Sequence, residues 1–365
     1  MTIIVFILVL VALIVVHELG HFFAAKLSGM RVDEFGVGYP PKAWGKRIGE
    51  TEYTLNWLPF GGFVKIFGED PEEGTLPAPR SFTSKPRTLQ ALVLVAGIAM
   101  NLLFAYLLIT ATLMIGTTRA LTAEEAARAP DAMLAVASVL PGSPADEAGL
   151  VPGDIIVRTE SAGGSYEGAD PRLFTALVGE NEAGAPLALA VREGDGTKEV
   201  AVAPEAGVIA ADPERVALGI GLTPVGTISV PFWQAPVEGA LLTWELTKQT
   251  AIALVHFFAG IFTLTADLSQ VAGPVGIAGA VGNASSDGLA PLMTITALIS
   301  INLALINLLP IPALDGGRLL FVLIEAVIRR PIAPSVANAV NGVGFALLIL
   351  LMLVVTASDI FKIVG

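Results

Sequence analysis

The sequence contains no cysteine, three histidines and few charged residues, and each scarcity excludes a class of protein. Without cysteine there is no disulfide framework, no thiolate ligand and no cysteine nucleophile, so any metal must be bound by nitrogen and oxygen atoms. Charged residues make up 15% of the chain and the mean hydropathy is +0.72, values that do not describe soluble domains. The formal net charge of -12 would repel phosphates, and no basic patch interleaved with aromatic residues occurs. We therefore expect a membrane protein without a nucleic-acid partner.

Long apolar segments predict membrane spans. Residues 1–30 begin with an uncharged run long enough for one helical span, and similar runs lie within 89–116 and 336–360. Residues 289–328 exceed one span and are interrupted by two prolines and a glycine pair at 310–317, so we expect a broken helix. Unwound backbone at membrane depth is tolerated only inside protein or beside a wet cavity, so the break indicates a site. A cleavable signal peptide is the alternative for the first segment, but the usual preceding basic residues are missing.

Residues 119–232 differ from the rest of the chain. They hold 17 acidic against 7 basic residues, with short alternating stretches such as LAVASV, and predict a soluble β-rich domain. Residues 26–88 instead hold 9 basic and 8 acidic residues, and Arg329 and Arg330 lie between the third and fourth spans. The positive-inside rule therefore places these two connections in the cytoplasm, with residues 31–88 as a cytoplasmic loop, and the acidic domain outside.

One further apolar segment lies within residues 232–268. If it crossed the membrane, the next span would run outward, and Arg329 and Arg330 would lie outside, against the positive-inside rule. We therefore expect an interfacial or re-entrant helix here.

His17, Glu18 and His21 form the pattern H-E-x-x-H inside the first apolar segment. On a helix this spacing places two imidazoles on one face, beside a glutamate that can act as a general base. Two histidines on a helix are more often ordinary surface or core residues. A charged group at the centre of a span costs about 2.5–3.5 kcal/mol on insertion scales, however, so Glu18 requires a compensating function. The pattern therefore predicts a zinc site.

Catalytic zinc takes three protein ligands and keeps one open position, so a third ligand is needed. Asp315 is best placed, because it lies in the broken segment near the same cytoplasmic depth as the two histidines. An aspartate before two glycines is also an ordinary turn residue. Glu34, Glu50 and Glu52 lie beyond the span in the loop, and His256 reads better as a solitary interfacial histidine. Glu34 and His256 remain the alternatives.

The motifs HELGH in the first segment and NLLPIPALDGG in the third resemble those of the site-2 protease family of intramembrane zinc metalloproteases. The bacterial sigma-E-protease branch fits best. Weaker matches extend over essentially the whole chain: PFGGFVKIFGE at 59–69, FTSKP at 82–86, GSPADEAGLVPGD at 142–154 and GPVGIA at 273–278. Two departures are Ile98, where the family usually has proline, and the room for one PDZ-like domain, at 132–204, where the best-known members carry two.

The resemblance implies a polytopic α-helical membrane protein with four transmembrane spans, one of them broken, and an inserted β-rich PDZ-like domain. It also implies that His17, His21 and Asp315 bind Zn²⁺ and that Glu18 is the general base. Asn307 would contact substrate or an oxyanion, although an asparagine in a membrane helix can simply bond to a neighbouring helix.

Two segments are expected to meet the substrate. PFGGFVKIF, which contains Gly62, Phe63 and Val64, reads as a glycine-hinged hairpin at the membrane interface. It would pair with a substrate helix that has become extended, or it would serve only as a membrane anchor. The PDZ-like domain would take an extended peptide by strand addition, with a β-rich spacer as the alternative.

These features predict a zinc endopeptidase of the bacterial cell inner membrane that cleaves the transmembrane segment of a single-span protein. The resemblance implies an anti-sigma factor as the substrate. The main rival is a non-proteolytic membrane scaffold whose PDZ-like domain binds peptides, and an intact glutamate beside two ligands favours the enzyme. A transporter with a midplane acidic site is disfavoured because the sequence has no inverted repeat.

Overall fold

The computed structural model describes residues 2–69, 78–161, 164–193, 196–209, 212, 214–263 and 273–364. The chain divides into two compact units. The first combines Met1–Met114 with Pro231–Gly365, and the second is Ile115–Val230.

The first unit is built mainly from helices. They are α1 (Thr2–Leu27), α2 (Arg87–Ile115), α6 (Ala235–Thr263), α7 (Pro274–Ser286), α8 (Leu289–Leu308), α9 (Asp315–Ile328) and α10 (Pro334–Val364), with a short 3-10 turn, η1 (Phe82–Ser84), before α2. Among the described residues, α1, α2, α8 and Ser335–Phe361 of α10 are long and apolar enough to cross a membrane. The four expected membrane helices are therefore present as candidates.

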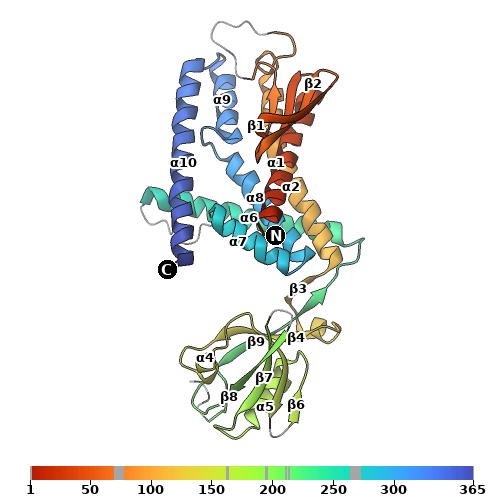
Figure 1. Ribbon diagram of the computed structural model, residues 1–365, viewed down its shortest axis with the longest axis vertical. Coiled ribbons are helices and arrows are strands. Elements are labelled where there is room, and N and C mark those ends of the chain that lie inside the picture. The colour runs from red at the N-terminus through yellow and green to blue at the C-terminus, as the bar shows by residue number, and fades with distance from the viewer. Residues whose placement is uncertain are drawn as a thin grey trace. The chain divides into compact units, whose positions relative to one another are not determined.

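Helix α6 corresponds to the segment that we expect at the membrane interface. In Figure 1 it runs across the common direction of α1 and α10. It ends at Thr263, and the remaining residues of the expected segment, 264–268, lie outside the described part of the chain. Its position in the interface stays a prediction.

Glycine sets the contact between α1 and α2. Gly20 of α1 lies against the backbone of Ala96 and Gly97, and an added Cβ atom would overlap the Ala96 carbonyl group. Lipid is as apolar as a neighbouring helix, so membrane helices associate largely through close packing, and small side chains let their backbones approach. Gly20 stands between the two histidines of the H-E-x-x-H pattern, so this close contact brings both imidazoles against α2.

The predicted break in residues 289–328 is confirmed. Helix α8 ends at Leu308 and α9 begins at Asp315, with Pro310 and Pro312 in the connection. Proline has no N–H group and cannot continue a helical ladder. Ala313 has a positive φ of 74°, and its N–H donates to the Asn341 side chain of α10 at 3.3 Å. Helix α10 therefore holds the unwound connection in place.

Between α1 and α2 lie two long strands, β1 (Val32–Ile48) and β2 (Thr51–Ile66). Phe35 pairs with both Tyr53 and Val64, so the first half of β1 lies between the two halves of β2. The expected separate hairpin within 59–67 is therefore wrong, because residues 62–66 pair with residues 32–37. Gly61 takes a φ of 113°, which bends β2 without reversing the chain.

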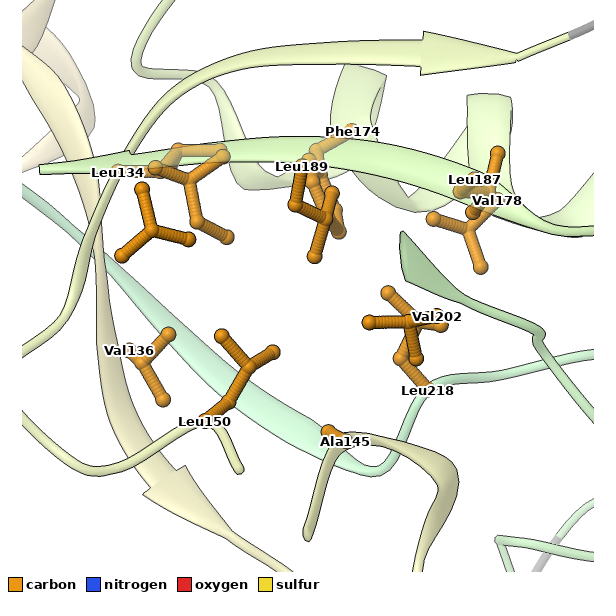
Figure 2. Packing of buried hydrophobic residues seen from close by; sticks show 12 residues of the cluster. Leu134, Val136, Ala145, Leu150, Phe174, Val178, Leu187, Leu189, Val202 and Leu218 are labelled. Atoms are coloured by element: carbon orange, nitrogen blue, oxygen red, sulfur yellow. The ribbon is translucent and has the colours of Figure 1, made fainter. Parts of the chain in front are cut away.

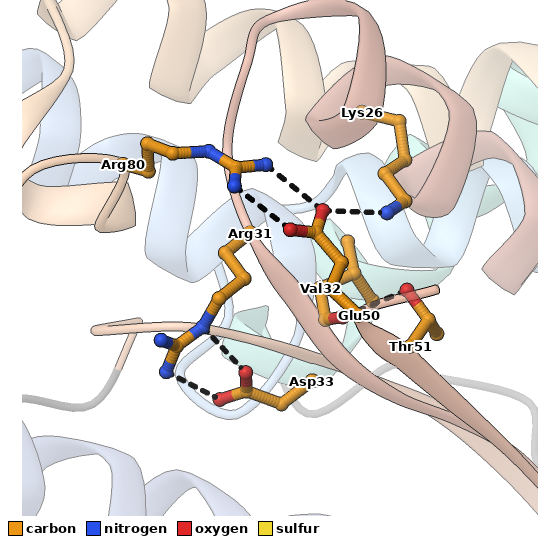
Figure 3. Close-up of polar contacts among 7 residues, drawn as sticks. All are labelled: Lys26, Arg31, Val32, Asp33, Glu50, Thr51 and Arg80. Atoms are coloured by element: carbon orange, nitrogen blue, oxygen red, sulfur yellow. Dashed lines mark hydrogen bonds and ion pairs between the residues drawn. The ribbon is translucent and has the colours of Figure 1, made fainter. Parts of the chain in front are cut away.

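Charged residues fasten this sheet to the end of α1 (Figure 3). Glu50, in the turn between β1 and β2, accepts hydrogen bonds from both terminal nitrogens of Arg80 at 2.8 Å and from Lys26 Nζ at 2.7 Å. These two cations lower the pKa of Glu50 to about 2. Its carboxylate is thus engaged in a structural ion pair.

The second unit contains a seven-stranded sheet with the order β3-β9-β4-β5-β7-β8, in which β6 pairs with β5. The strands are β3 (Thr117–Ala120), β4 (Met133–Val139), β5 (Ile155–Ser161), β6 (Gly164–Tyr166), β7 (Leu187–Glu193), β8 (Gly196–Val202) and β9 (Ile220–Ile228). The described part of this unit also contains the helices α3 (Ala123–Ala126), α4 (Pro144–Glu147) and α5 (Pro171–Gly179).

An apolar core joins this sheet to α5. Figure 2 shows Leu134, Leu189 and Phe174 turned into one cluster, and alternate residues of β7 are buried as a strand with one covered face requires. The expected β-rich domain within 119–232 is thus confirmed. The limits that we expect for the PDZ-like domain, 132–204, leave out β9. This strand pairs with β4, from Val139 opposite Ile220 to Met133 opposite Val225.

Candidate metal centre

The imidazoles of α1 and the carboxylate of α9 converge on one point. His17 Nε2 and His21 Nε2 lie 3.1 Å apart, and Asp315 Oδ2 is 2.9 Å from the first and 3.2 Å from the second. Both histidines are more than nine-tenths buried. They form, with Asp315, the group of potential metal ligands that occurs among the described residues. Residues almost 300 positions apart are thus brought together as the sequence predicts.

These three atoms fit a tetrahedral zinc ion. Bonds from zinc to nitrogen or oxygen are about 2.0–2.2 Å, so two ligand atoms of one tetrahedral ion lie about 3.3 Å apart. The separations of 2.9, 3.1 and 3.2 Å are close to that value. Electron pairs that face one another at this distance repel unless a cation or proton lies between them. Two nitrogens and one carboxylate oxygen are also a known ligand set of catalytic zinc.

The start of α9 is suited to carry Asp315. The carboxylate of Asp315 lies at the N-terminus of α9, where the helix dipole stabilises a negative charge by about 0.3–1 kcal/mol. The next two residues, Gly316 and Gly317, are buried, and a Cβ atom on either would overlap the carbonyl groups of Leu309 and Ile311. The connection from α8 therefore folds directly over the first turn of α9, and the glycines allow it.

Helix α2 completes the surroundings of the histidines. His21 Nδ1 lies 2.8 Å from the Val93 carbonyl oxygen, and His17 Nδ1 lies 3.2 Å from the Asn101 side chain. We did not identify these α2 residues from the sequence. The signal was an asparagine inside the uncharged second span, four residues after Gly97 and therefore on the same helix face.

Glu18 lies next to His17 but on a different side of α1, where β2 covers it. An added Cβ atom at Gly62 would lie 3.5 Å from Glu18 Cγ, so the backbone of β2 runs directly beside this glutamate. Glu18 is half-buried. The structure thus brings together the expected general base and one of the expected substrate-binding residues.

The other expected substrate-binding residues lie as follows. Val64 packs against the apolar cluster that includes Phe22 and Ala25 of α1, and Phe63 stacks on Tyr39 with ring centroids 6.3 Å apart. Asn307 is half-buried in the last turn of α8. The described contacts do not join Asn307 to His17, His21 or Asp315, and its role stays a prediction.

The alternative ligands lie elsewhere. Glu34 accepts a hydrogen bond from Thr54 at 2.7 Å, and Glu52 pairs with Lys42. His256 is exposed on α6 and does not belong to the ligand group found in the described chain. This placement favours Asp315 as the third ligand.

The sequence profile of Peptidase family M50 matches residues 5–351. This chain belongs to peptidase family M50. A protein of Clostridium perfringens named as a candidate zinc metalloprotease is 37% identical over 353 residues, 96% of this chain and 95% of the relative. The zinc metalloprotease RasP of Oceanobacillus iheyensis is 30% identical and the regulator of sigma-W protease RasP of Bacillus subtilis 29% identical, each with 98% of both chains covered.

Membership in M50 confirms three predictions from the sequence. The chain is a metalloprotease, its metal is zinc, and its resemblance to the site-2 proteases holds over nearly its whole length. Its four described helices that are long and apolar enough to cross a bilayer fit an integral membrane protein.

Proposed function

We propose that this M50 protease is an intramembrane zinc endopeptidase that cleaves the transmembrane segments of single-span membrane proteins. The observation that carries the proposal is that His17 and His21, beside Glu18 on a helix apolar enough to cross a bilayer, converge with Asp315 at the start of α9. A structural metal site needs no glutamate next to its ligands, so Glu18 favours proteolysis over a scaffold.

In this mechanism His17, His21 and Asp315 would hold the zinc ion. When bound, zinc polarises the scissile carbonyl group and lowers the pKa of water at the site toward 7. Glu18 takes the proton from the attacking water and then delivers it to the amine nitrogen that leaves. Burial of the histidines by α2 keeps bulk water away from the ligands, and Asn307 is a candidate contact for the substrate.

The edge of β2 beside Glu18 is suited to hold an extended substrate. A transmembrane helix satisfies all its backbone hydrogen bonds internally, so unwinding it in the membrane requires replacement partners. Residues 62–66 pair with β1 along one edge, and the described chain forms no ladder on the other edge. Strand addition there would place a peptide bond beside Glu18. Gly62 keeps this approach free of a side chain, while Phe63 and Val64 fix the strand through their packing.

We propose that the second unit is a PDZ-like module outside the inner membrane. A cavity of about 290 Å³ lies between α5 and the start of β9, and its lining includes Phe174, Val178, Ile220 and Leu222. Among the described residues, strand β3 pairs with β9 over Val225–Ile228 and leaves the start of β9 without a ladder on this edge. The edge of β9 next to this cavity is therefore open to an extended peptide.

An anti-sigma factor is our proposed substrate, because the relative in Bacillus subtilis is named a regulator of sigma-W protease. The proposed orientation is tested with single cysteines at Ser165 and Ser84, which are both exposed in this cysteine-free chain. An impermeant thiol reagent should label Ser165→Cys from outside the intact inner membrane. Labelling of Ser84→Cys under the same conditions would overturn the orientation.

The activity is tested with the variants Glu18→Gln and Asp315→Ala and a transmembrane reporter substrate. Glu18→Gln should abolish cleavage and keep one equivalent of zinc, since the base is lost and the ligands stay. Asp315→Ala should lose zinc, whereas the matched variant His256→Ala should keep both zinc and cleavage. Cleavage by Glu18→Gln near the wild-type rate would refute the mechanism.

A further inference from the structure

Asn101 of α2 presents an unusual arrangement beside the metal centre. Its side chain is completely buried, and its Nδ2 atom lies 3.2 Å from His17 Nδ1. Its carbonyl oxygen Oδ1 has no hydrogen-bond partner among the described residues. A buried carbonyl oxygen without a donor costs about 1–3 kcal/mol, so a partner is to be expected for it.

The chemistry of a metal-binding imidazole identifies that partner. When Nε2 gives its electron pair to zinc, the ring carries its remaining proton on Nδ1, which is then a donor. In the amide orientation of the structure this donor faces another donor, the Nδ2 group. The two ends of an asparagine amide have nearly the same shape, and a rotation of 180° exchanges them. The rotated amide places Asn101 Oδ1 opposite the Nδ1–H group of His17, so the oxygen gains a donor and the imidazole gains an acceptor.

The neighbourhood holds Asn101 firmly in this position. Ser300 Oγ of α8 donates to the Asn101 backbone oxygen at 2.8 Å, and Ser300 is completely buried. Gly97, one turn earlier on α2, leaves room for the imidazoles. The second histidine has an equivalent partner, because the Val93 carbonyl oxygen lies 2.8 Å from His21 Nδ1. Helix α2 therefore supplies an acceptor for each ring, one from the backbone and one from a side chain.

We propose that Asn101 is a positioning residue of the zinc site: its Oδ1 accepts the hydrogen bond from His17 Nδ1–H. This bond fixes the tautomer that leaves Nε2 free for zinc, and it orients the ring toward Asp315 and His21. The inference rests on the proposed function in that it assigns a supporting residue to the same site. Partners of this kind typically change metal affinity 10–100-fold.

Zinc affinity tests the proposal directly, without an activity assay. In competition with a chelator, the full-length protein with Asn101→Leu should bind zinc about 10–100-fold more weakly than the wild type, and Asn101→Ala should behave in the same way. Asn101→Asp keeps an acceptor and should recover most of the affinity. Thr112→Val is a matched control, because it removes another buried polar side chain of α2. The Thr112 hydroxyl donates to the Leu108 carbonyl oxygen of the same helix. This control variant should bind zinc like the wild type.

The melting temperature of the zinc-free variants separates positioning from folding. The proposal is supported if Asn101→Asp recovers the zinc affinity while the zinc-free forms of Asn101→Asp and Asn101→Leu melt at the same temperature. Wild-type affinity in both Asn101→Leu and Asn101→Ala would overturn it, even if cleavage by the wild type supports the proposed function. The proposed function fails separately if the wild type binds zinc and cleaves no transmembrane reporter.

Discussion

Gly97 of α2 lies so close to His21 of α1 that an added Cβ atom would stand 2.5 Å from His21 Nε2. The same atom would lie 2.9 Å from Cε1 of His17. Real Cβ atoms do not approach other atoms so closely, so any side chain at position 97 must displace an imidazole or separate α1 from α2. The geometry of the zinc site therefore requires glycine at position 97.

Gly97→Ala should therefore weaken zinc binding and cleavage. A ligand displaced by about 1 Å can reduce activity about 100-fold, and we expect a loss between tenfold and 100-fold. Zinc stoichiometry and reporter cleavage measure it. The control is Gly279→Ala in α7, where an added Cβ atom meets nothing within 4 Å. This control should be neutral or stabilise by up to about 1 kcal/mol, as alanine does in a helix.

A second prediction concerns the ion pair of Glu69 and Arg318, which joins the end of β2 to α9. Arg318 lies one turn after Asp315, and Glu69 follows the strand that covers Glu18. The pair therefore connects the end of the strand beside Glu18 to the first turn of the helix that carries Asp315. Glu69→Gln or Arg318→Gln should destabilise the protein by about 1–2 kcal/mol, the range for hydrogen bonds to charged groups that are partly exposed.

The same substitutions should lower kcat/KM for the reporter while zinc content stays at one equivalent. The exchange of both charges, Glu69→Arg with Arg318→Glu, should recover part of the lost rate if the pair acts through its attraction. A double variant as impaired as the sum of its own single variants, Glu69→Arg and Arg318→Glu, would show that the two side chains act independently.

The pKa of Glu50 predicts how the contact between α1 and the β1–β2 sheet depends on pH. Arg80 and Lys26 lower this pKa from about 4.5 to about 2, so the folded protein holds the carboxylate charged more readily than the unfolded chain does. The stabilisation is complete above about pH 4.5 and is lost as the pH falls toward 2. Glu50→Gln should therefore lower the melting temperature at pH 7, and the difference from the wild type should shrink as the pH falls through this range. Glu199→Gln, an exposed glutamate of β8, should show no such effect.

The ligands of the zinc site could be predicted because the membrane makes their presence costly. Glu18 in an apolar segment and a helix break before Asp315 are both unfavourable in lipid, and the sequence shows both directly. The contribution of α2 could not be predicted in this way. Which face of α2 meets the histidines depends on the contact of Gly20 with Ala96, a tertiary relationship that helical periodicity does not specify.

Two other features depend on partners that are distant in sequence. Gly61 and Gly62 read locally as a turn, whereas the structure uses Gly61 to bend a strand whose partner, residues 32–37, precedes it by about 30 positions. Strand β9 pairs with β4, which lies more than 80 residues earlier in the sequence. Pairing at such separations is fixed by the whole sheet and not by local propensity.

The last prediction is that the second unit restrains proteolysis by its bulk. Its first and last strands, β3 and β9, pair directly, with Thr117 opposite Ile228. Paired residues on antiparallel strands are about 5 Å apart, so a short flexible linker can replace residues 117–228 without straining α2 or α6. The replacement therefore removes the unit whole, whereas deletion of residues 132–204 would leave β9 without β4.

The chain with this replacement should keep its zinc, because every proposed ligand lies in the first unit. It should cleave a reporter with a trimmed outer domain and should also cleave an untrimmed one that the wild type rejects. Thr175→Trp, which fills the cavity between α5 and β9 and keeps the bulk of the unit, should retain the selectivity of the wild type. If the replacement binds zinc but cleaves neither reporter, the unit delivers substrate to the site. If Thr175→Trp abolishes cleavage while the variant keeps its zinc and the melting temperature of the wild type, that delivery occurs through the cavity.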